Sequence, residues 1–257
     1  MADEILCDVK DHIATITMNR PEKRNALNNA SLLQLQDHLQ QLNQQDDVRV
    51  VVFRGNGRVF SAGRDLREMG QQPQSTEKPP PEITEVFHQI EQCRYPTIAM
   101  VHGDALAGGC ELALHCDLRL MAEEARMGMP LARLGLIVPF ELTRKLVQII
   151  GPAHTRQLLF TAQPVYGPRA FAMGMVHQVM PQAELEQATY ELAGTIAANA
   201  PLALAGIKQI LLRIETRDDH LEHADLDDLV RQNRLSADAK EGVRAQLEKR
   251  PPVFQGI

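Results

Sequence analysis

Several features that would assign this sequence to a familiar structural class are missing. Its cysteines show no CxxC spacing, and the histidines near them lack the spacing of a zinc finger; the four are Cys7, Cys93, Cys110 and Cys116. A disulfide framework and a structural zinc site are therefore not expected. No uninterrupted apolar run approaches the ~18 residues that a membrane-spanning helix needs. No pair of carboxylates or histidines has metal-ligand spacing either, so we expect no metal.

An excess of positive charge is also missing. Lysine and arginine number 27 against 33 aspartate and glutamate residues, which gives a formal net charge of −6. This balance argues against a nucleic-acid-binding surface over the whole protein, although it is compatible with a local basic patch. The first residues, Met1 to Glu4, are acidic where a secretory signal would be basic, and no apolar segment follows them. We expect a reduced, cytoplasmic protein with neither a membrane nor a nucleic acid as its partner.

What the chain does contain is ordinary globular sequence for one to two domains. It has 257 residues, of which 44% are hydrophobic and 23% charged, and this is enough to bury a substantial core. Residues 4–19 alternate between apolar and polar side chains and predict a hairpin that turns at Lys10-Asp11. Leucines spaced by three or four residues after Asn28-Asn29 predict a helix. Short apolar runs predict buried strands at residues 48–53, 97–101 and 118–121.

After Pro139 the pattern becomes helical as far as Gln246. Prolines stand where they suit the first turn of a helix, at Pro152, Pro168 and Pro201. Strands joined by helices, followed by helices alone, predict an α/β region of residues 1–195 and a helical region of residues 196–257. Residues 71–81 include four prolines, and we expect a mobile surface loop there.

One segment has the composition of an anion-binding helix start. The chain from Val101 to Leu112 ends a predicted strand at Gly103 and begins a helix with Gly108 and Gly109. The first N–H groups of a helix have no partner within the helix, and glycine lets a ligand approach them closely. Glu111 lies three residues after Gly108, on roughly the same face, so that a donor and a carboxylate could together move a proton beside a carbonyl. Taken alone, the segment is more typical of a tightly packed helix start with a solvated glutamate.

A second segment, Arg58 to Leu66, has a similar character. Small residues follow a predicted buried strand and precede a polar helix start, so a further backbone N–H can be presented. Two donors that converge on one oxygen form an oxyanion hole, in which the loss of one donor costs ~3–4 kcal/mol of transition-state stabilisation. Alone, this segment too is typical of an ordinary strand-to-helix turn.

Together the two segments resemble the crotonase family, also called the enoyl-CoA hydratase/isomerase superfamily. Residues 60–66 (FSAGRDL) resemble its first oxyanion segment, and residues 103–117 (GDALAGGCELALHCD) resemble its second. Residues 19–27 (NRPEKRNAL) resemble the family's CoA-contacting turn, and residues 241–252 (EGVRAQLEKRPP) resemble its C-terminal ending. These four motifs occur in order and span nearly the whole chain, and on them the chain is identified as a member of the family.

The resemblance implies an α/β fold, a spiral of repeated ββα units, and a helical C-terminal region that forms a homotrimer or a dimer of trimers. It also implies a CoA-thioester substrate whose oxygen is bound by the backbone N–H groups of Arg64 and Gly108. Contacts with the CoA part of the substrate are implied for Lys23, Arg24, Ala26, Ala62, Arg64, Asp65, Leu66, Gly108 and, from a neighbouring subunit, Lys249. Because CoA is strongly anionic, these cations are compatible with an acidic protein. No cofactor is expected beyond the CoA that belongs to the substrate.

The sequence departs from the family's hydratases at one position. The resemblance places two glutamates beside the enoyl group; Glu111 matches the first, and Leu131 stands at the position of the second. A leucine neither holds a water molecule by charge nor delivers a proton, and we expect Leu131 to line the acyl pocket. Glu141 lies ten residues further on. It either reaches the cleft after the turn at Pro139 or is an exposed glutamate at a helix start.

These residues leave four functions open. Hydration of 2-enoyl-CoA is the leading one, with Glu111 as general acid and base. A one-base 3,2-enoyl-CoA isomerase is the alternative that fits a single glutamate, because one carboxylate can take a proton from C2 and return it at C4. Hydrolysis or decarboxylation that uses Glu141 is the third, and a non-catalytic family member that binds CoA or RNA is the fourth. Burial in an apolar cleft would raise the pKa of Glu111, which suits the removal of an α-proton near neutral pH.

Overall fold

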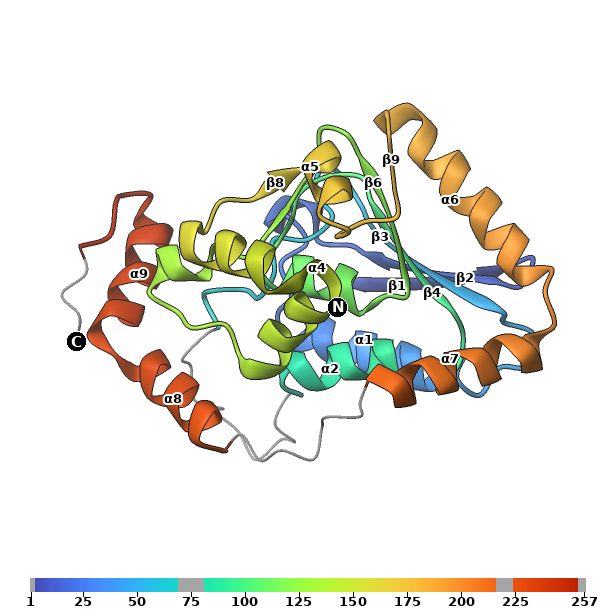
Figure 1. The fold of residues 1–257 in the computed structure, drawn as a ribbon, viewed down its shortest axis with the longest axis horizontal. Helices are drawn as coiled ribbons and strands as arrows, with labels where there is room; N and C mark the ends of the chain where they lie inside the picture. Colours follow the sequence, from blue (N-terminus) through green and yellow to red (C-terminus); the bar gives the residue numbers. More distant parts are fainter. Residues whose placement is uncertain (1–2, 69–80, 216–223, 254–257) are drawn as a thin grey trace.

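Figure 1 shows the computed structural model, which describes residues 3–68, 81–215 and 224–253. Within these ranges the main sheet has six strands in the order β1-β2-β3-β4-β6-β9. They are β1 (Ile5–Lys10), β2 (Ile13–Met18), β3 (Val50–Gly55), β4 (Thr97–Val101), β6 (Leu118–Ala122) and β9 (Gln178–Met180). The first two form an antiparallel hairpin, and the later pairs are parallel. The predicted hairpin and three predicted strands are thus confirmed, whereas the loop expected at 71–81 lies, apart from Pro81, outside the described residues.

A second, smaller sheet gives the chain its spiral path. Its strands are β5 (Ala105–Leu106), β7 (Arg126–Gly128) and β8 (Val165–Tyr166), in that order. Single bridges from Ser61 to Ala105 and from Leu27 to Arg64 continue the same pattern of pairing. After a main strand the chain therefore steps across to the second layer and returns through a helix. This is the ββα repeat that the resemblance implied.

The middle of the main sheet is buried on both faces, which is why β3 and β4 are continuous apolar runs rather than alternating ones. The helices of this region are α1 (Asn29–Leu42), α2 (Ile83–Glu91), α3 (Gly108–His115) and α6 (Gln182–Ala197). Helix α6 packs against β2, β3, β4 and β6, while α2 packs against both α1 and α3. Helix α1 begins with a capping box, in which the Asn28 side chain and the Ser31 hydroxyl each accept the other's backbone N–H at 2.8 Å.

The C-terminal part is helical as predicted, except for the short strands β8 and β9, which the sequence pattern did not indicate. Its helices are α4 (Phe140–Thr161), α5 (Gly167–Ala172), α7 (Pro201–Glu215), α8 (Ala224–Leu235) and α9 (Ala237–Glu248); two 3-10 helices, η1 (Pro21–Lys23) and η2 (Pro130–Leu134), lie earlier. Helix α4 bends at Gly151, whose φ is +70°, directly before Pro152. In the described ranges no single helix is long and apolar enough to cross a membrane. Helices α6 and α7, bent by 103° at their junction, pass that test only as a pair, on length and composition.

Helices α8 and α9 lie at the opposite end of the molecule from α6 (Figure 1), and α9 packs against η2. This contact is made by backbone, since a Cβ at Gly242 would lie only 2.1 Å from the Leu134 carbonyl oxygen. From α8, the Asn233 side chain accepts a hydrogen bond from the Ile137 N–H at 3.0 Å. The C-terminal helices thereby hold the short helix that carries Leu131.

Replacing Gly242 with alanine should lower the free energy of unfolding by ~1–3 kcal/mol, because the new methyl group would force α9 away from η2. Gly194, inside α6, is the matched control, since a Cβ there meets nothing within 4 Å. Gly194→Ala should instead stabilise the protein by ~0.5–1 kcal/mol through the better helix propensity of alanine. Urea unfolding of the two variants measures these changes, and equal changes would show that the contact at Gly242 is unimportant.

Candidate active site

The first oxyanion segment is held between two other stretches of backbone. The Leu27 N–H donates to the Gly63 carbonyl at 2.7 Å, and the Asp65 N–H donates to the Leu27 carbonyl at 2.9 Å. On the other side, the Leu106 N–H donates to the Ser61 carbonyl at 2.9 Å. Main-chain hydrogen bonds thus join this segment to the CoA-contacting turn and to β5, which brings three motifs that are far apart in the sequence to one place.

The two predicted oxyanion donors lie side by side at this place. A Cβ added to Gly63, whose φ is +88°, would lie 2.7 Å from the Gly108 nitrogen. A Cβ added to Gly108 would lie 3.4 Å from the Arg64 nitrogen. Glycine is needed at both positions, because a side chain would fill the space around the two amides. Within the described residues neither amide donates a hydrogen bond, and that of Gly108 opens α3, so both can donate to one external oxygen.

Ala107, the residue before α3, has an unusual backbone conformation, with φ at +50° and ψ at −122°. Its N–H donates to the Gly128 carbonyl of β7 at 2.8 Å. A non-glycine residue in such a region is strained by ~1–3 kcal/mol and persists only where its surroundings hold it. Here the conformation of Ala107 sets the direction in which the Gly108 N–H points.

Glu111 is fully buried, with 0% of its surface exposed. Both of its carboxyl oxygens lack a hydrogen-bond partner within the described part of the chain. Burial raises the pKa of Glu111 well above the usual value for a carboxyl group, and the charge of Lys145 opposes this shift. The solvated glutamate considered from the sequence is thus excluded. An unpartnered buried carboxyl costs stability, and this makes Glu111 the candidate for chemistry among the described residues around α3.

His115 lies one turn further along α3 and forms part of the surroundings of Glu111. Its Nδ1 is 2.8 Å from the Glu111 carbonyl oxygen and 3.9 Å from Glu111 Oε2. Its ring packs against that of Phe87 of α2 at a centroid distance of 5.5 Å. Burial lowers the pKa of His115 to about 4, so the ring is neutral near pH 7 and Nδ1 donates its proton to the backbone carbonyl. The histidine therefore does not neutralise the carboxylate.

The CoA-contacting turn carries an exposed cluster of cations. Lys23 ends η1, and Arg24 follows it in a left-handed conformation with φ at +54°. Arg58 is exposed as well and follows Gly57, where a Cβ would lie 2.8 Å from Pro21. Arg58 is not among the residues predicted from the sequence, because its place beside the turn depends on this contact between distant segments. The three cations, Lys23, Arg24 and Arg58, form an anion-attracting surface.

The other residues implied for CoA lie next to this turn. The Ala62 N–H donates to the Arg24 carbonyl at 3.0 Å. The Asp65 carboxylate accepts a hydrogen bond from Arg20 at 3.3 Å, which offsets its negative charge. Three of these residues are half-buried: Ala26, Ala62 and Leu66.

Three predicted residues remain. Leu131 is half-buried in η2 and packs against the hydrophobic core, and its lining of the acyl pocket stays a prediction. Glu141, in the first turn of α4, has 58% of its side chain exposed and pairs with Arg144 at 3.0 Å. It is the exposed helix-start glutamate, and the structure does not bring it to Glu111. Lys249 is exposed at the end of α9, and the implied contact with a neighbouring subunit stays a prediction.

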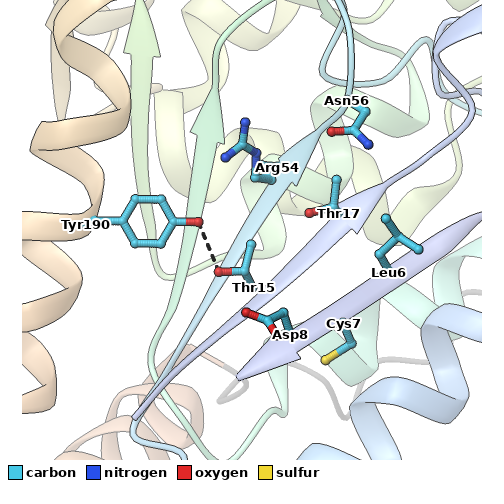
Figure 2. A pocket seen from close by; sticks show the side chains of 8 residues that line it. All are labelled: Leu6, Cys7, Asp8, Thr15, Thr17, Arg54, Asn56 and Tyr190. Atoms are coloured by element: carbon cyan, nitrogen blue, oxygen red, sulfur yellow. Dashed lines mark hydrogen bonds between the residues drawn. The ribbon is translucent and has the colours of Figure 1, made fainter. Parts of the chain in front are cut away.

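A surface hollow of about 360 Å³ lies elsewhere, over β1–β3 and beside α6 (Figure 2). Among its lining residues, Thr15 bonds to the Tyr190 hydroxyl at 3.0 Å, and Arg54 pairs with Glu186 of α6 at 2.7 Å. The hollow shares no residue with the surroundings of Glu111. We therefore place the chemistry at the start of α3 and not in this hollow.

Comparison with known proteins identifies the family of the chain. The chain matches the family described as Enoyl-CoA hydratase/isomerase over residues 8–256. It is 32% identical to the 2,3-dehydroadipyl-CoA hydratase of Escherichia coli, covering 98% of this chain and 99% of that protein. Two solved structures are similar. One is an enoyl-CoA hydratase/isomerase from Pseudoalteromonas atlantica (TM-score 0.89, 26% identity, 98% of this chain and 100% of that one). The other is a methylmalonyl-CoA decarboxylase (TM-score 0.88, 30% identity, 100% of both chains).

These matches extend over nearly the whole chain, as do the four sequence motifs, and the resemblance is therefore confirmed. The chain belongs to the enoyl-CoA hydratase/isomerase family.

Proposed function

We propose that the protein is an enoyl-CoA hydratase that adds water to a 2-enoyl-CoA. The observation that carries the proposal is the buried, unpartnered carboxyl of Glu111 in the same helical turn as the free Gly108 amide. A thioester oxygen held by the Arg64 and Gly108 amides would place the reacting carbons on the Glu111 side of the helix start. The hydratase named above, which covers the full length of this chain, supports hydration.

One carboxylate suffices for this reaction, so Leu131 does not prevent it. Glu111 takes a proton from a water molecule while the oxygen of that water forms a bond to C3. The electrons of the C2=C3 double bond move toward the thioester, and the two amides stabilise the oxyanion that develops. Glu111 then returns the proton to C2. The product carries a hydroxyl at C3, and the enzyme regains its carboxylate.

The raised pKa of Glu111 suits this double role. A carboxylate with an ordinary pKa is a weak base, whereas one whose conjugate acid has a pKa nearer neutrality both accepts and returns a proton readily. Burial is the cause of the shift, and the same burial strengthens the two amide donors, because their field is not screened by water.

Leu131 favours a second candidate, a one-base 3,2-enoyl-CoA isomerase. In that reaction Glu111 removes a proton from C2 of a 3-enoyl-CoA and returns it at C4, so the double bond moves into conjugation and no water takes part. An apolar side chain in place of a second carboxylate fits a site from which water is excluded. Hydrolysis or decarboxylation through Glu141 is not supported, since that side chain is exposed and paired with Arg144.

The nucleotide part of the substrate is assigned to the cluster of Lys23, Arg24 and Arg58, whose charge complements the phosphates of CoA. Neither reaction requires a cofactor besides the CoA of the substrate. We place the enzyme in the cytoplasm, on the composition of the sequence.

Two substrates distinguish the candidates. Purified protein is offered trans-2-enoyl-CoA or 3-enoyl-CoA, and the ultraviolet absorbance of the conjugated thioester is followed. A hydratase lowers the absorbance of the first, and an isomerase raises that of the second. Glu111→Gln keeps the size of the side chain and removes its acid–base function, and it should lower either rate by ~100- to 10,000-fold. Activity that survives in this variant would contradict the proposal, and inertness toward both substrates would leave a non-catalytic member that binds CoA or RNA.

Burial of Glu111 should also make stability depend on pH. Because its pKa is raised from 4.5, the folded protein holds a proton there over a pH range in which the unfolded chain has lost it. This stabilisation is complete at low pH and is lost as the pH rises toward the folded pKa, with a limiting slope of ~1.4 kcal/mol per pH unit. Glu111→Gln lacks the dependence. As the pH rises from about 4.5 to 7, the free energy of unfolding of Glu111→Gln should therefore increase relative to that of the wild-type protein. A difference between the two proteins that does not change with pH would contradict this prediction.

We propose further that the chain assembles as a homotrimer or a dimer of trimers through α7. Of residues 201–215, all described, only Lys208 is buried, and it donates to Asp117 at 2.7 Å and to the Tyr95 carbonyl at 2.9 Å. The helix therefore turns a lysine inward and large apolar side chains outward. These are Leu202, Ile207, Ile210, Leu211 and Ile214. The last four have the spacing of a single stripe, and monomers rarely leave such a stripe in water.

Ile210→Glu should dissociate the assembly, because a charge at the centre of the stripe weakens association by ~2 kcal/mol or more. Gln209→Glu adds the same charge beside the stripe and should leave the assembly intact. Sedimentation velocity of the two variants gives the masses. The proposal would fail if the wild-type protein were monomeric or if both variants behaved alike.

A further inference from the structure

A buried ion pair joins the helices around α3. Lys145 of α4 lies 2.5 Å from Glu91 at the end of α2 and 3.3 Å from Glu215 at the end of α7. Only 12% of the Lys145 side chain and 16% of the Glu91 side chain are exposed. Burial alone would raise the pKa of Glu91, but His88 and Lys145 hold it at about 2, so this carboxylate is charged at neutral pH. Such a pair is a costly way to join helices, because apolar side chains of similar volume often stabilise as well or better.

The pair lies near His115, one turn along α3 from Glu111, because Phe87, one turn before Glu91 on α2, packs against the His115 ring at a centroid distance of 5.5 Å. Helix α3 packs against both α2 and α4. Lys145 and Glu91 both act electrostatically on His115, whose Nδ1 is 3.9 Å from Glu111 Oε2. The field of Lys145 also reaches Glu111 and favours its carboxylate form. Within the described residues no hydrogen bond stabilises that form.

The other titratable and charged groups around α3 do not offer the same countercharge. Apart from Lys145, they are Cys110 and His115 on α3, His88 and Glu91 on α2, Glu141 and Arg144 on α4, Glu215 on α7 and Arg119 on β6. His115 is neutral near pH 7, and burial raises the pKa of the Cys110 thiol. Arg144 pairs with Glu141 at the surface. Arg119 is buried as well, but it donates to the Ala113, Leu114 and Cys116 carbonyls at the far end of α3. Lys145 is thus the buried cation whose charge acts on Glu111.

We propose that Lys145 is a positioning residue that supplies the countercharge for the carboxylate form of Glu111, while Glu91 fixes Lys145 in place and limits its field. The inference rests on the proposed acid–base role of Glu111. Lys145 touches no reacting atom; it acts through a poorly screened interior in which a charge has effect over several ångströms. It thereby sets the pH at which Glu111 becomes a base.

Lys145 and Glu91 have opposite effects on how easily Glu111 loses its proton. This difference distinguishes the proposed role from a purely structural one. Removing the positive charge of Lys145 makes the carboxylate of Glu111 harder to form. Removing the negative charge of Glu91 makes it easier to form. If the ion pair only held α2 and α4 together, either substitution would loosen the same contact and admit water to Glu111. Both substitutions would then shift the pKa of Glu111 in the same direction.

The pH dependence of kcat/KM tests this, because its acid limb reports the pKa of the base in the free enzyme. Lys145→Gln should move the acid limb to higher pH and lower kcat/KM by about three- to tenfold at a fixed pH below the limb. Glu91→Gln should move the limb to lower pH. Lys145→Arg keeps the charge and should restore the wild-type profile.

Opposite shifts in the two variants, with a near-wild-type profile for Lys145→Arg, would support the inference. Shifts in the same direction, or none, would overturn it. If Lys145→Gln does not fold, the direction of the shift in Glu91→Gln decides alone. An inactive Glu111→Gln variant combined with unmoved acid limbs would overturn only the role of Lys145, whereas a fully active Glu111→Gln variant would overturn the proposed function itself.

Discussion

The close approach of two backbone segments, at Gly63 and Gly108, is the constraint on which the rest of the structure depends. A single added carbon at Gly63 would come within 2.7 Å of the Gly108 nitrogen, and one at Gly109 would come within 2.2 Å of the Ser61 oxygen. Segments can approach so closely only if each is fixed along its length. The spiral provides this, because successive units are joined by main-chain hydrogen bonds from Leu27 through to Gly128. The double-layered fold is thus the means by which the amides of Arg64 and Gly108 come to lie side by side.

Two features that lower the stability of the fold lie close to this contact. Ala107 is in a strained conformation, and Glu111 is buried without a partner a few residues later. Both features oppose folding, and both lie within one turn of the start of α3. The sheet behind them is continuous and apolar, so its burial can offset these local costs. A rigid core therefore supports a site that would not hold its geometry alone.

The sequence predicted the helices and strands that are long enough to show a periodic pattern of apolar residues. The hairpin at residues 4–19 alternates over two full strands, and its register follows that alternation. In contrast, β8 and β9 have two and three residues, too few to show a period, and their pairing depends on strands far away in the chain. Local pattern also left Glu141 undecided, because a carboxylate after a turn can point either way until the helix start and Arg144 are placed.

The features of the site that the sequence did not predict depend on contacts between residues far apart in the chain. The motifs located the two segments that meet at Gly63 and Gly108, yet the full burial of Glu111 depends on α2 and α4 covering α3. A glutamate in the first turn of a helix is otherwise an ordinary solvated residue. Arg58 joins the cation cluster only because Gly57 packs on Pro21. The pair of Lys145 and Glu91 likewise connects residues 54 positions apart, and no local pattern signals it.

Helix α7 is held in place by different interactions from those that hold the core. Its inward contact is a polar one, through Lys208, while its apolar face is turned to the outside. A helix held in this way has little local free energy of unfolding of its own. If a second copy covers the apolar face, mass action rather than the core determines how firmly the helix is held. Helix α7 would then fray on dilution while the sheet stayed intact, and its resistance to proteolysis would depend on the protein concentration.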